Sequence, residues 1–560
     1  MSHPFKPLGS GQMRHRMAPE ARKETVLRPI AGLPEMALSP LAPRLRDLSD
    51  KVIYVIKAWR HGSELDPVVD RIAGVLGERF PSARVNVIHK TSPQMTDDPG
   101  LWDEVIARAD AFVLGASQSC STTTWTLTWA AALERRHRPG VVLLFDSLAQ
   151  NAETTCQRLG MALRWVSVPY PPVKVTGACL SAFSDQVSEA LTRPLAPQEK
   201  KAGRIRPGET RDATFTGTFT EIQDFFCENG WSDGLPLVPP TGERVEHMLK
   251  GTSHGPQEVV TSSMWPERLR VTVEKVAVNG VMAGCRPEYM PVLLATVDAF
   301  SRQDYGSTTR STNSFSFMQV VNGPIIREIA MNPGLNALGP GNRANASIGR
   351  ALRLFIVNLG GGRPGVNIMG TQGNVSSYTF CFPENERQSP WEPFSVSRGY
   401  APKESTVTTF SGGWSHVGNY CHVHDNRESL KALARSMATF EWPNGIVLLL
   451  SPLRARALAE EGFTRDNVAG FIHEHATAPA RRFRSDHFYR KFIVPIMEGK
   501  AMYGETDLWP ASYRDLPDDA LIPVYPRDHI YAVVVGGETN RAMQGWKMAY
   551  PSTASVDRWR

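Results

Sequence analysis

The chain has 560 residues, of which 41% are hydrophobic and 21% charged, and a formal net charge of +6 at pH 7. This length exceeds what a single hydrophobic core serves, so we expect two or three domains. The mild charge does not predict nucleic-acid binding, and no apolar run reaches the roughly 18 residues of a membrane span. Because the N-terminus also lacks the apolar segment of a secretory signal, we expect a cytoplasmic protein that does not associate with membranes.

Seven cysteines are scattered along the chain, and no two have CxxC spacing. This pattern excludes a zinc ribbon or a dithiol motif and is typical of reduced cytosolic thiols. Residues 1–50 are rich in Pro and Arg and have weak periodicity, which predicts an extended arm on a neighbouring domain or subunit. Together with the many Gly and Pro residues, the arm favours a homo-oligomer.

Residues 51–195 alternate between strand-like and helix-like segments. Such alternation predicts a doubly wound parallel sheet, a flavodoxin- or Rossmann-like α/β domain. The predicted strands are 52–56, 84–88, 111–115, 141–145 and 164–168. The predicted helices are 67–80, 102–109, 122–136, 149–159 and 181–191.

Residues 196–215 are charged, contain Pro and Gly, and are predicted to be a linker. Residues 216–560 are predicted to form a larger mixed α/β domain. Its predicted helices are 219–228, 287–300, 343–359, 427–440, 453–461 and 465–476. Its predicted strands are 315–321, 378–382, 406–410, 445–450 and 530–535.

The stretch 110–125 of the first domain reads as a buried strand, a Gly-containing turn and a helix that begins at Ser and Thr residues. Cys120 lies in the turn, at the carboxyl end of a parallel strand, where open α/β sheets bind their ligands. The positive end of the helix dipole predicts a lowered thiol pKa there. The competing interpretation is a small buried cysteine that fills space.

Cys285 occupies a similar position, before a helix with Pro near its start and beside Arg286. We therefore predict a lowered pKa for this thiol as well, with Glu288 as a nearby proton donor or acceptor. A cysteine that packs in a turn against the core is the alternative.

A Gly/Pro loop leads into the predicted helix at 343–359. At 100° per residue, Arg343, Ser347 and Arg350 share the face opposite the apolar stripe. With Asn345 and the free N–H groups of the helix start, they predict a cradle for a carboxylate or phosphate. The alternative is a solvated helix face.

The stretch 416–425 contains three histidines, a cysteine and an aspartate. His416, His422 and His424 make a transition-metal site one hypothesis, although the spacing matches no established metal motif. An ordered His-rich loop that lines a cleft is the competing interpretation. The loop 231–240, Glu384 and Trp391 also have the local sequence of binding loops, but each type is more often structural.

The strand, turn and helix around Cys120 resemble the UGSC family, which takes its name from a selenocysteine-Gly-Ser-Cys motif. This resemblance covers the first domain and implies a distant similarity to the selenoprotein subunits of glycine reductase. The stretches 283–291, 339–353 and 381–391 resemble a partner domain of such proteins. When Cys120 is matched to the last Cys of the motif, Ser117 stands in the place of selenocysteine and Gln118 in that of Gly.

Our leading hypothesis is an enzyme with an interdomain cleft that takes a small anionic organic substrate. Cys285 or Cys120 would act at a carbon–sulfur or other carbon–heteroatom bond, as in a lyase, reductase or transferase. The expected substrate contacts are Arg343, Asn345, Ser347, Arg350, Ser117, Glu384 and Trp391. The alternatives are a metal-dependent hydrolase or lyase that uses the His416–His424 loop, and a non-catalytic subunit of a reductase-like complex.

Overall fold

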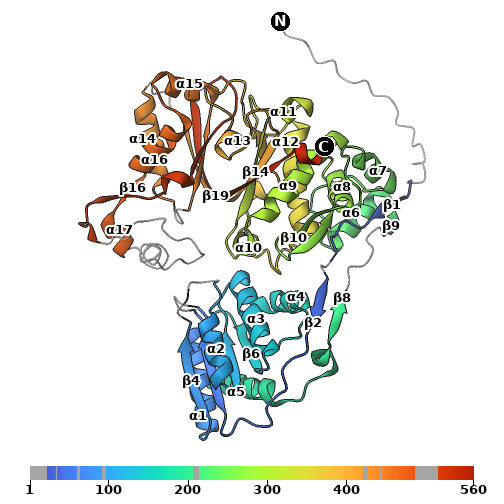
Figure 1. Ribbon diagram of the computed structural model, residues 1–560, viewed down its shortest axis with the longest axis vertical. Coiled ribbons are helices and arrows are strands. Elements are labelled where there is room, and N and C mark those ends of the chain that lie inside the picture. Colours follow the sequence, from blue (N-terminus) through green and yellow to red (C-terminus); the bar gives the residue numbers. More distant parts are fainter. Residues whose placement is uncertain are drawn as a thin grey trace, which may run out of the picture.

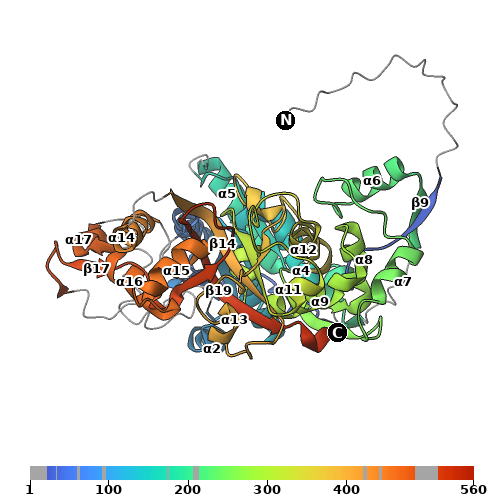
Figure 2. The same cartoon turned by 90° about the horizontal axis from the view of Figure 1, so that it is seen from above.

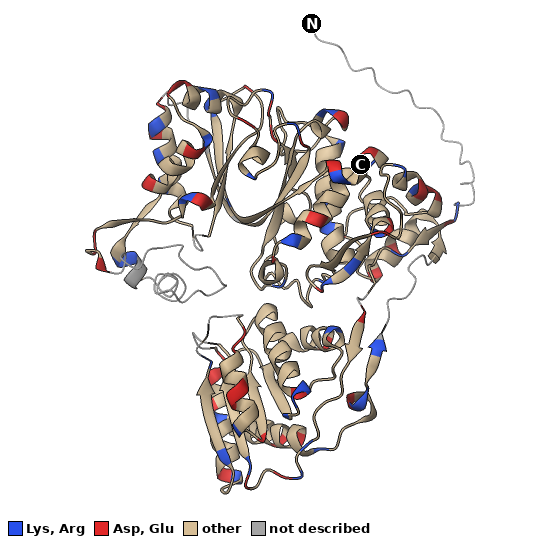
Figure 3. Ribbon diagram, in the orientation of Figure 1, with Lys and Arg blue, Asp and Glu red and all other residues tan. Residues whose placement is uncertain are grey.

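The computed structural model describes residues 22–32, 35–59, 63–90, 92, 96–172, 175, 177–205, 213–420, 425–440, 444–485 and 515–560. They form two units (Figure 1). The N-terminal unit comprises the described residues between 35 and 205, and the C-terminal unit comprises residues 22–32 together with the described residues from 213 onward. Acidic and basic residues are interspersed over both units (Figure 3), which agrees with the small net charge.

The N-terminal unit is built on a five-stranded parallel sheet with the strand order β4-β3-β5-β6-β7. Its side chains are apolar on both faces, as expected for parallel strands that helices cover on both sides. The strands are β3 (Val52–Lys57), β4 (Arg84–His89), β5 (Ala111–Gly115), β6 (Gly140–Phe145) and β7 (Trp165–Val168). The predicted doubly wound sheet is therefore confirmed.

Helices pack on both faces of this sheet. Ile53 and Val55 of β3 belong to one apolar cluster with α1 (Asp66–Arg79) and α5 (Gly177–Thr192). Tyr54 and Ile56, which point the other way, belong to a second cluster. The second cluster includes side chains of α2 (Pro99–Arg108), α3 (Cys120–Arg135) and α4 (Ala149–Leu159).

The first residues of the chain that the structure describes pack with the C-terminal unit. There β1 (Glu24–Leu27) pairs with β9 (Ala213–Gly217), and the amide of Ala31 donates to the carbonyl of Asn358 at 2.9 Å. The chain then crosses to the N-terminal unit along β2 (Met36–Leu38) and runs back along β8 (Gly203–Ile205). Because β2 and β8 pair with each other, two adjacent strands join the units (Figure 1). The predicted linker thus contains strands that pair with the arm.

Two buried ion pairs hold the arm and the returning strand on the N-terminal unit. Glu134 of α3 accepts hydrogen bonds from Arg44 at 2.9 Å and from the amide of Ala42 at 2.7 Å. Arg164 makes two hydrogen bonds of 2.8 Å to the carboxylate of Glu199. All four side chains are almost fully buried. Removal of either partner would therefore leave an unpaired buried charge, which is strongly destabilising.

The C-terminal unit is built on a six-stranded mixed sheet with the order β13-β12-β14-β19-β15-β18. Side chains from all six strands share one apolar cluster, and the amide of Asn385, after β13, donates to Val534 of β18 at 2.7 Å. The sheet therefore curls until its two edges meet. Its strands are β12 (Ser316–Asn322), β13 (Cys381–Pro383), β14 (Thr406–Tyr420), β15 (Ile446–Leu450), β18 (Ile530–Val534) and β19 (Ala542–Ser555).

Helices α8, α9 and α12 pack together beside this sheet (Figure 2) and form the largest apolar cluster. Helices α14 to α16 cover its other end. These helices are α8 (Val273–Met282), α9 (Met290–Arg302), α12 (Arg343–Leu354, extended by a π turn, Phe355–Leu359), α14 (Asn426–Met437), α15 (Pro452–Glu460) and α16 (Arg465–His475). The shorter elements are α6 (Phe219–Glu228), α7 (Gly242–Leu249), β10 (Val259–Met264), β11 (Leu269–Thr272), α10 (Gly306–Thr309), α11 (Ile325–Glu328), α13 (Phe394–Ser397), β16 (Thr477–Pro479), α17 (Ala480–Ser485) and β17 (Leu521–Pro523).

The mixed α/β fold predicted for this region is confirmed. None of the described helices is long and apolar enough to cross a membrane.

The Arg164–Glu199 pair gives a test of the N-terminal unit. We expect Glu199→Gln to lower the free energy of unfolding by about 3 kcal/mol at pH 7, because it leaves a buried guanidinium without its counter-charge. Chemical denaturation measures this loss. Glu189→Gln is the matched control. The Glu189 carboxylate is exposed, and its ion pair with Arg193 is long, at 3.8 Å, so its loss should change the free energy of unfolding little.

The pH dependence of this difference has a defined sign. The hydrogen bond from Arg164 lowers the pKa of Glu199 below the ordinary value of 4.5 for a glutamate. The stabilisation is therefore complete above pH 4.5 and is lost as the pH falls through the folded-state pKa. The difference in the free energy of unfolding between wild type and Glu199→Gln should become smaller under acid conditions. A difference that stays constant down to pH 3 would contradict this account.

Candidate functional site

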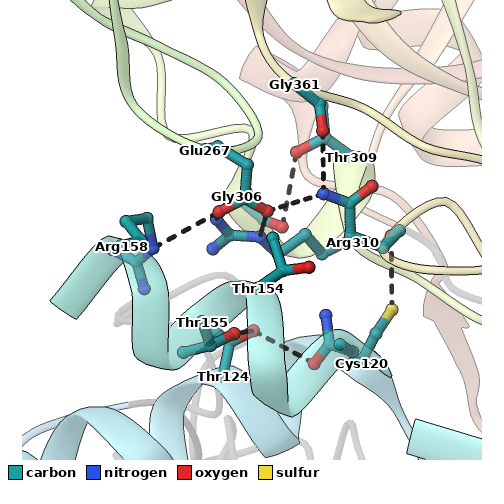
Figure 4. Close-up of polar contacts among 12 residues, drawn as sticks. Cys120, Thr124, Thr154, Thr155, Arg158, Glu267, Gly306, Thr309, Arg310 and Gly361 are labelled. Carbon is teal, nitrogen blue, oxygen red and sulfur yellow. Dashed lines mark hydrogen bonds and ion pairs between the residues drawn. The ribbon is translucent and has the colours of Figure 1, made fainter. Parts of the chain in front are cut away.

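Cys120 is the first residue of α3, directly after the turn that follows β5. Ser119 precedes it as the N-cap and forms a capping box with Thr122, which explains why the helix begins here. The thiol is fully buried and donates to the backbone carbonyl of Asn367 in the C-terminal unit at 3.5 Å (Figure 4). The predicted position at the carboxyl end of a parallel strand is correct, but a contact between the units covers the side chain.

This burial overturns the predicted thiolate. Loss of solvent raises the pKa of Cys120 to about 12, although Arg310 and the first amides of α3 act in the opposite direction. A helix terminus contributes about 0.3–1 kcal/mol, whereas one pKa unit corresponds to about 1.4 kcal/mol. Desolvation therefore exceeds the helix dipole, and Cys120 is a neutral thiol at pH 7.

The same correction applies to Cys285. Burial raises its pKa to about 12, against the effects of Ser347, Arg343 and Arg350, which lower it. Cys285 packs in the largest apolar cluster of the C-terminal unit, whereas Cys120 packs in a cluster of the N-terminal unit. The structure thus does not bring these two thiols together, and Glu288 is exposed at the surface.

The contact between the units centres on a buried carboxylate, that of Glu267 (Figure 4). It lies 3.4 Å from Arg158 of α4 and 2.8 Å from Arg310, and it accepts a hydrogen bond of 2.6 Å from Asn367. Burial lowers the pKa of Arg158 to about 10, and Arg310 adds to this effect while Glu267 opposes it. The carboxylate of Glu267 therefore pairs with one arginine from each unit, Arg158 from the N-terminal unit and Arg310 from the C-terminal unit.

Ser117, in the position matched to selenocysteine, is also buried. Its hydroxyl donates to the side-chain oxygen of Gln118 at 2.7 Å. Neither residue lines the main cavity described below. A substrate contact for Ser117 stays a prediction, as does the replacement of selenocysteine.

The polar face predicted on α12 is largely engaged by the protein itself. Arg350 binds the carboxylate of Asp233 with two hydrogen bonds, of 2.7 and 2.9 Å, and also donates to the carbonyls of Leu235 and Pro236. The amide of Asn345 binds backbone groups of Asn332 and Ala337. These two side chains therefore shape the neighbouring loops, and ligand contacts for them stay a prediction.

The remaining two residues of that face diverge. Ser347 is buried beside Cys285, while Arg343 is exposed and donates to the carbonyl of Gly284 at 3.0 Å. The free anion cradle predicted from helical periodicity is thus not formed as one surface.

A different face of α12 lines a cavity of about 840 Å³. The residues at this face are Gly349, Leu352, Arg353, Ile356 and Val357, which follow the helical repeat. The other walls come from residues 227–234, 308–317 and 364–380. All lining residues therefore belong to the C-terminal unit.

Arg353 is the residue of this cavity that the sequence did not single out. Its guanidinium has no hydrogen-bond or ion-pair partner among the residues that the structure describes. Burial lowers its pKa, and the nearby Asp233 and Tyr378 oppose that shift. The available signal was its place three residues after Arg350, about one helical turn further along α12.

Cys227 also lines this cavity and is exposed. It is the one fully exposed thiol among the cysteines that the structure describes, since Cys120, Cys156, Cys285 and Cys381 are buried and Cys179 is intermediate.

Glu384 and Trp391 lie elsewhere, near the place where the two edges of the curled sheet meet. The buried carboxylate of Glu384 accepts from Asn322 at 2.6 Å and from Arg465 at 2.8 Å. The indole of Trp391 donates to the carbonyl of Phe463 at 2.9 Å. Burial raises the pKa of the neighbouring Glu386. These residues hold the sheet closed, and a substrate contact for Glu384 or Trp391 stays a prediction.

His416 of β14 is exposed and stacks on Trp546, with 4.4 Å between the ring centroids. His422 and His424 lie outside the described residues, so the metal hypothesis stays a prediction. Within the described part of the chain, no three His, Cys, Asp or Glu side chains are grouped to hold a metal ion.

The fold and the turn at Cys120 define the N-terminal unit as a doubly wound α/β domain whose motif cysteine faces a partner unit. Residues 25–196 match the model of the UGSC family. A comparison with curated proteins finds no match.

Thiol reactivity tests these assignments. Native protein treated with iodoacetamide at pH 8 should be alkylated at Cys227, while Cys120 and Cys285 stay unmodified until denaturant is added, because only the thiolate reacts. Peptide mass spectrometry reads each site. Rapid alkylation of Cys120 or Cys285 in the folded protein would contradict the raised pKa values and support the lowered values predicted from the sequence.

Proposed function

We propose that the protein is an enzyme that binds a small organic carboxylate in the cavity beside α12, with Arg353 as the anchor of the anionic group. The guanidinium of Arg353 has no hydrogen-bond or ion-pair partner among the described residues and borders a cavity of about 840 Å³, and this observation supports the proposal. A partly buried charge that makes no hydrogen bond is unfavourable, and a bound carboxylate offsets that cost through two parallel hydrogen bonds.

The charge of the lining favours a monoanion. Asp233 and Arg353 are the charged residues among those that line the cavity, and Arg350 already neutralises Asp233. One positive charge therefore remains for a ligand.

The rest of the lining favours an apolar body on this ligand. Leu352, Ile356, Phe317 and Phe380 line one part of the cavity, and Ser314, Gln372 and Asn374 supply polar groups elsewhere. Ligand sites commonly combine an apolar wall with a few polar groups that set orientation.

The reaction class in this proposal is the cysteine-assisted cleavage or transfer at a carbon–sulfur or other carbon–heteroatom bond that we expect from the sequence. Cys120 and Cys285 are neutral buried thiols, so we assign a thiol step in this cavity to Cys227. The burial of the motif cysteine also favours a second candidate, a binding subunit without chemistry of its own. Retention of a bound thioether carboxylate without turnover would distinguish that subunit from an enzyme.

Binding of benzoate and of its neutral analogue benzamide tests the anchor. Calorimetry should show that wild type prefers benzoate and that Arg353→Gln weakens benzoate about 10- to 100-fold, the range of a lost charge-assisted hydrogen bond. Benzamide binding should change little. Arg435→Gln, at an exposed arginine of α14, is the control and should bind like wild type.

Two results would contradict the proposal. One is equal affinity of wild type for benzoate and benzamide, and the other is unchanged benzoate affinity in Arg353→Gln. A loss in Arg343→Gln alone would instead support the anion site predicted at the start of α12.

A further inference from the structure

One wall of the α12 cavity is made of two chain segments that lie side by side. Ser311 and Ile368 form a parallel bridge, and the amides of Met369 and Thr371 donate to the carbonyls of Ser311 and Thr312 at 3.1 and 3.0 Å. These bonds join residues 308–314 and 364–371 into one strip, which we call the shared wall.

The two faces of the shared wall meet different partners. Ser311, Ile368 and Gly370 line the cavity. Asn367 and Met369, the two neighbours of Ile368 along the chain, contact the N-terminal unit instead. Met369 packs against an apolar cluster of that unit, and the carbonyl of Asn367 accepts from the thiol of Cys120.

Arg310 ties the other segment to the same contact. Its guanidinium binds Glu267, whose carboxylate also pairs with Arg158 of α4 (Figure 4). The side chain of Asn367 donates to Glu267 at 2.6 Å as well. On the side away from the cavity, both segments of the shared wall therefore contact groups that belong to the N-terminal unit or that touch it.

We propose that the N-terminal unit positions this wall of the ligand cavity, with Cys120 and Arg158 as its positioning residues. The inference rests on the proposed function for its effect on ligand binding, but the mechanical part stands on the contacts alone. Cys120 acts through the carbonyl of Asn367, and Arg158 acts through Glu267 and Arg310. In this chain the motif cysteine serves as a hydrogen-bond donor and makes no covalent step.

A pair of substitutions separates a donor from a nucleophile. Cys120→Ser keeps an O–H donor, whereas Cys120→Ala removes the donor with little change in volume. We expect Cys120→Ala to increase hydrogen exchange at the amides of Met369 and Thr371 and to weaken benzoate, each by about fivefold or more, because a buried carbonyl loses its partner. Cys120→Ser should restore most of both.

Arg158→Gln provides a second route to the same wall and keeps the test valid should Cys120→Ala fold poorly. It should raise exchange at the same two amides. Cys156→Ala is the matched control, since Cys156 is a buried thiol of the N-terminal unit and packs in an apolar cluster that contains no residue of the shared wall. Hydrogen exchange at the amides of Met369 and Thr371 in Cys156→Ala should equal that in wild type.

The outcomes distinguish the two proposals. Unchanged exchange at Met369 and Thr371 in both Cys120→Ala and Arg158→Gln would overturn the positioning role, whatever benzoate does. Faster exchange in a protein whose wild type does not bind benzoate would keep the positioning role and remove the carboxylate proposal. If Cys120→Ser behaved like Cys120→Ala in both measurements, a donor role for the thiol would be excluded.

Discussion

The contact between the two units depends on one desolvated carboxylate. Glu267 is buried, and the guanidiniums of Arg158 and Arg310 approach it from different units while Asn367 adds a hydrogen bond. A buried carboxylate is costly without such partners, and Arg158 is the partner that the N-terminal unit contributes. The same contact places Cys120 against the carbonyl of Asn367 and Met369 against the apolar cluster of the N-terminal unit. One arrangement of the two units thus sets the apolar packing of Met369, the ion pairs of Glu267 and the position of one wall of the α12 cavity.

This arrangement gives the motif turn a structural meaning. A helix start and a parallel-strand end usually expose a thiol to ligands and lower its pKa. Here the second unit removes solvent from Cys120, and burial outweighs the helix dipole. The charge left for a ligand lies instead on Arg353, which borders an open volume and has no partner in the described part of the chain. We therefore propose that a ligand binds at the face of α12 rather than at the motif.

Local periodicity predicted much of this fold, and long-range contacts explain the rest. The five parallel strands and their helices were predicted to within a few residues, because short apolar runs alternate with helix-like segments. Helix α8 was missed because all ten of its residues are buried, which removes the amphipathic pattern. Strand β19 and the second half of β14 were missed because their register shifts beside Gly412 hide the alternation. The burial of Cys120 depends on Asn367, 247 residues away, and the pairing of Arg350 with Asp233 spans 117 residues. No local pattern reveals such contacts, so the sequence selected Arg350, whereas Arg353 is the arginine of α12 without a partner among the described residues.

A crystal structure with bound 4-bromobenzoate tests the central claim most directly, because anomalous scattering from bromine locates the ligand without ambiguity. The account predicts the carboxylate at the guanidinium of Arg353, the ring against Leu352 and Ile356 of α12, and the bromine near the shared wall. Bromine density beside Arg343 or Cys120 with an empty α12 cavity would contradict it.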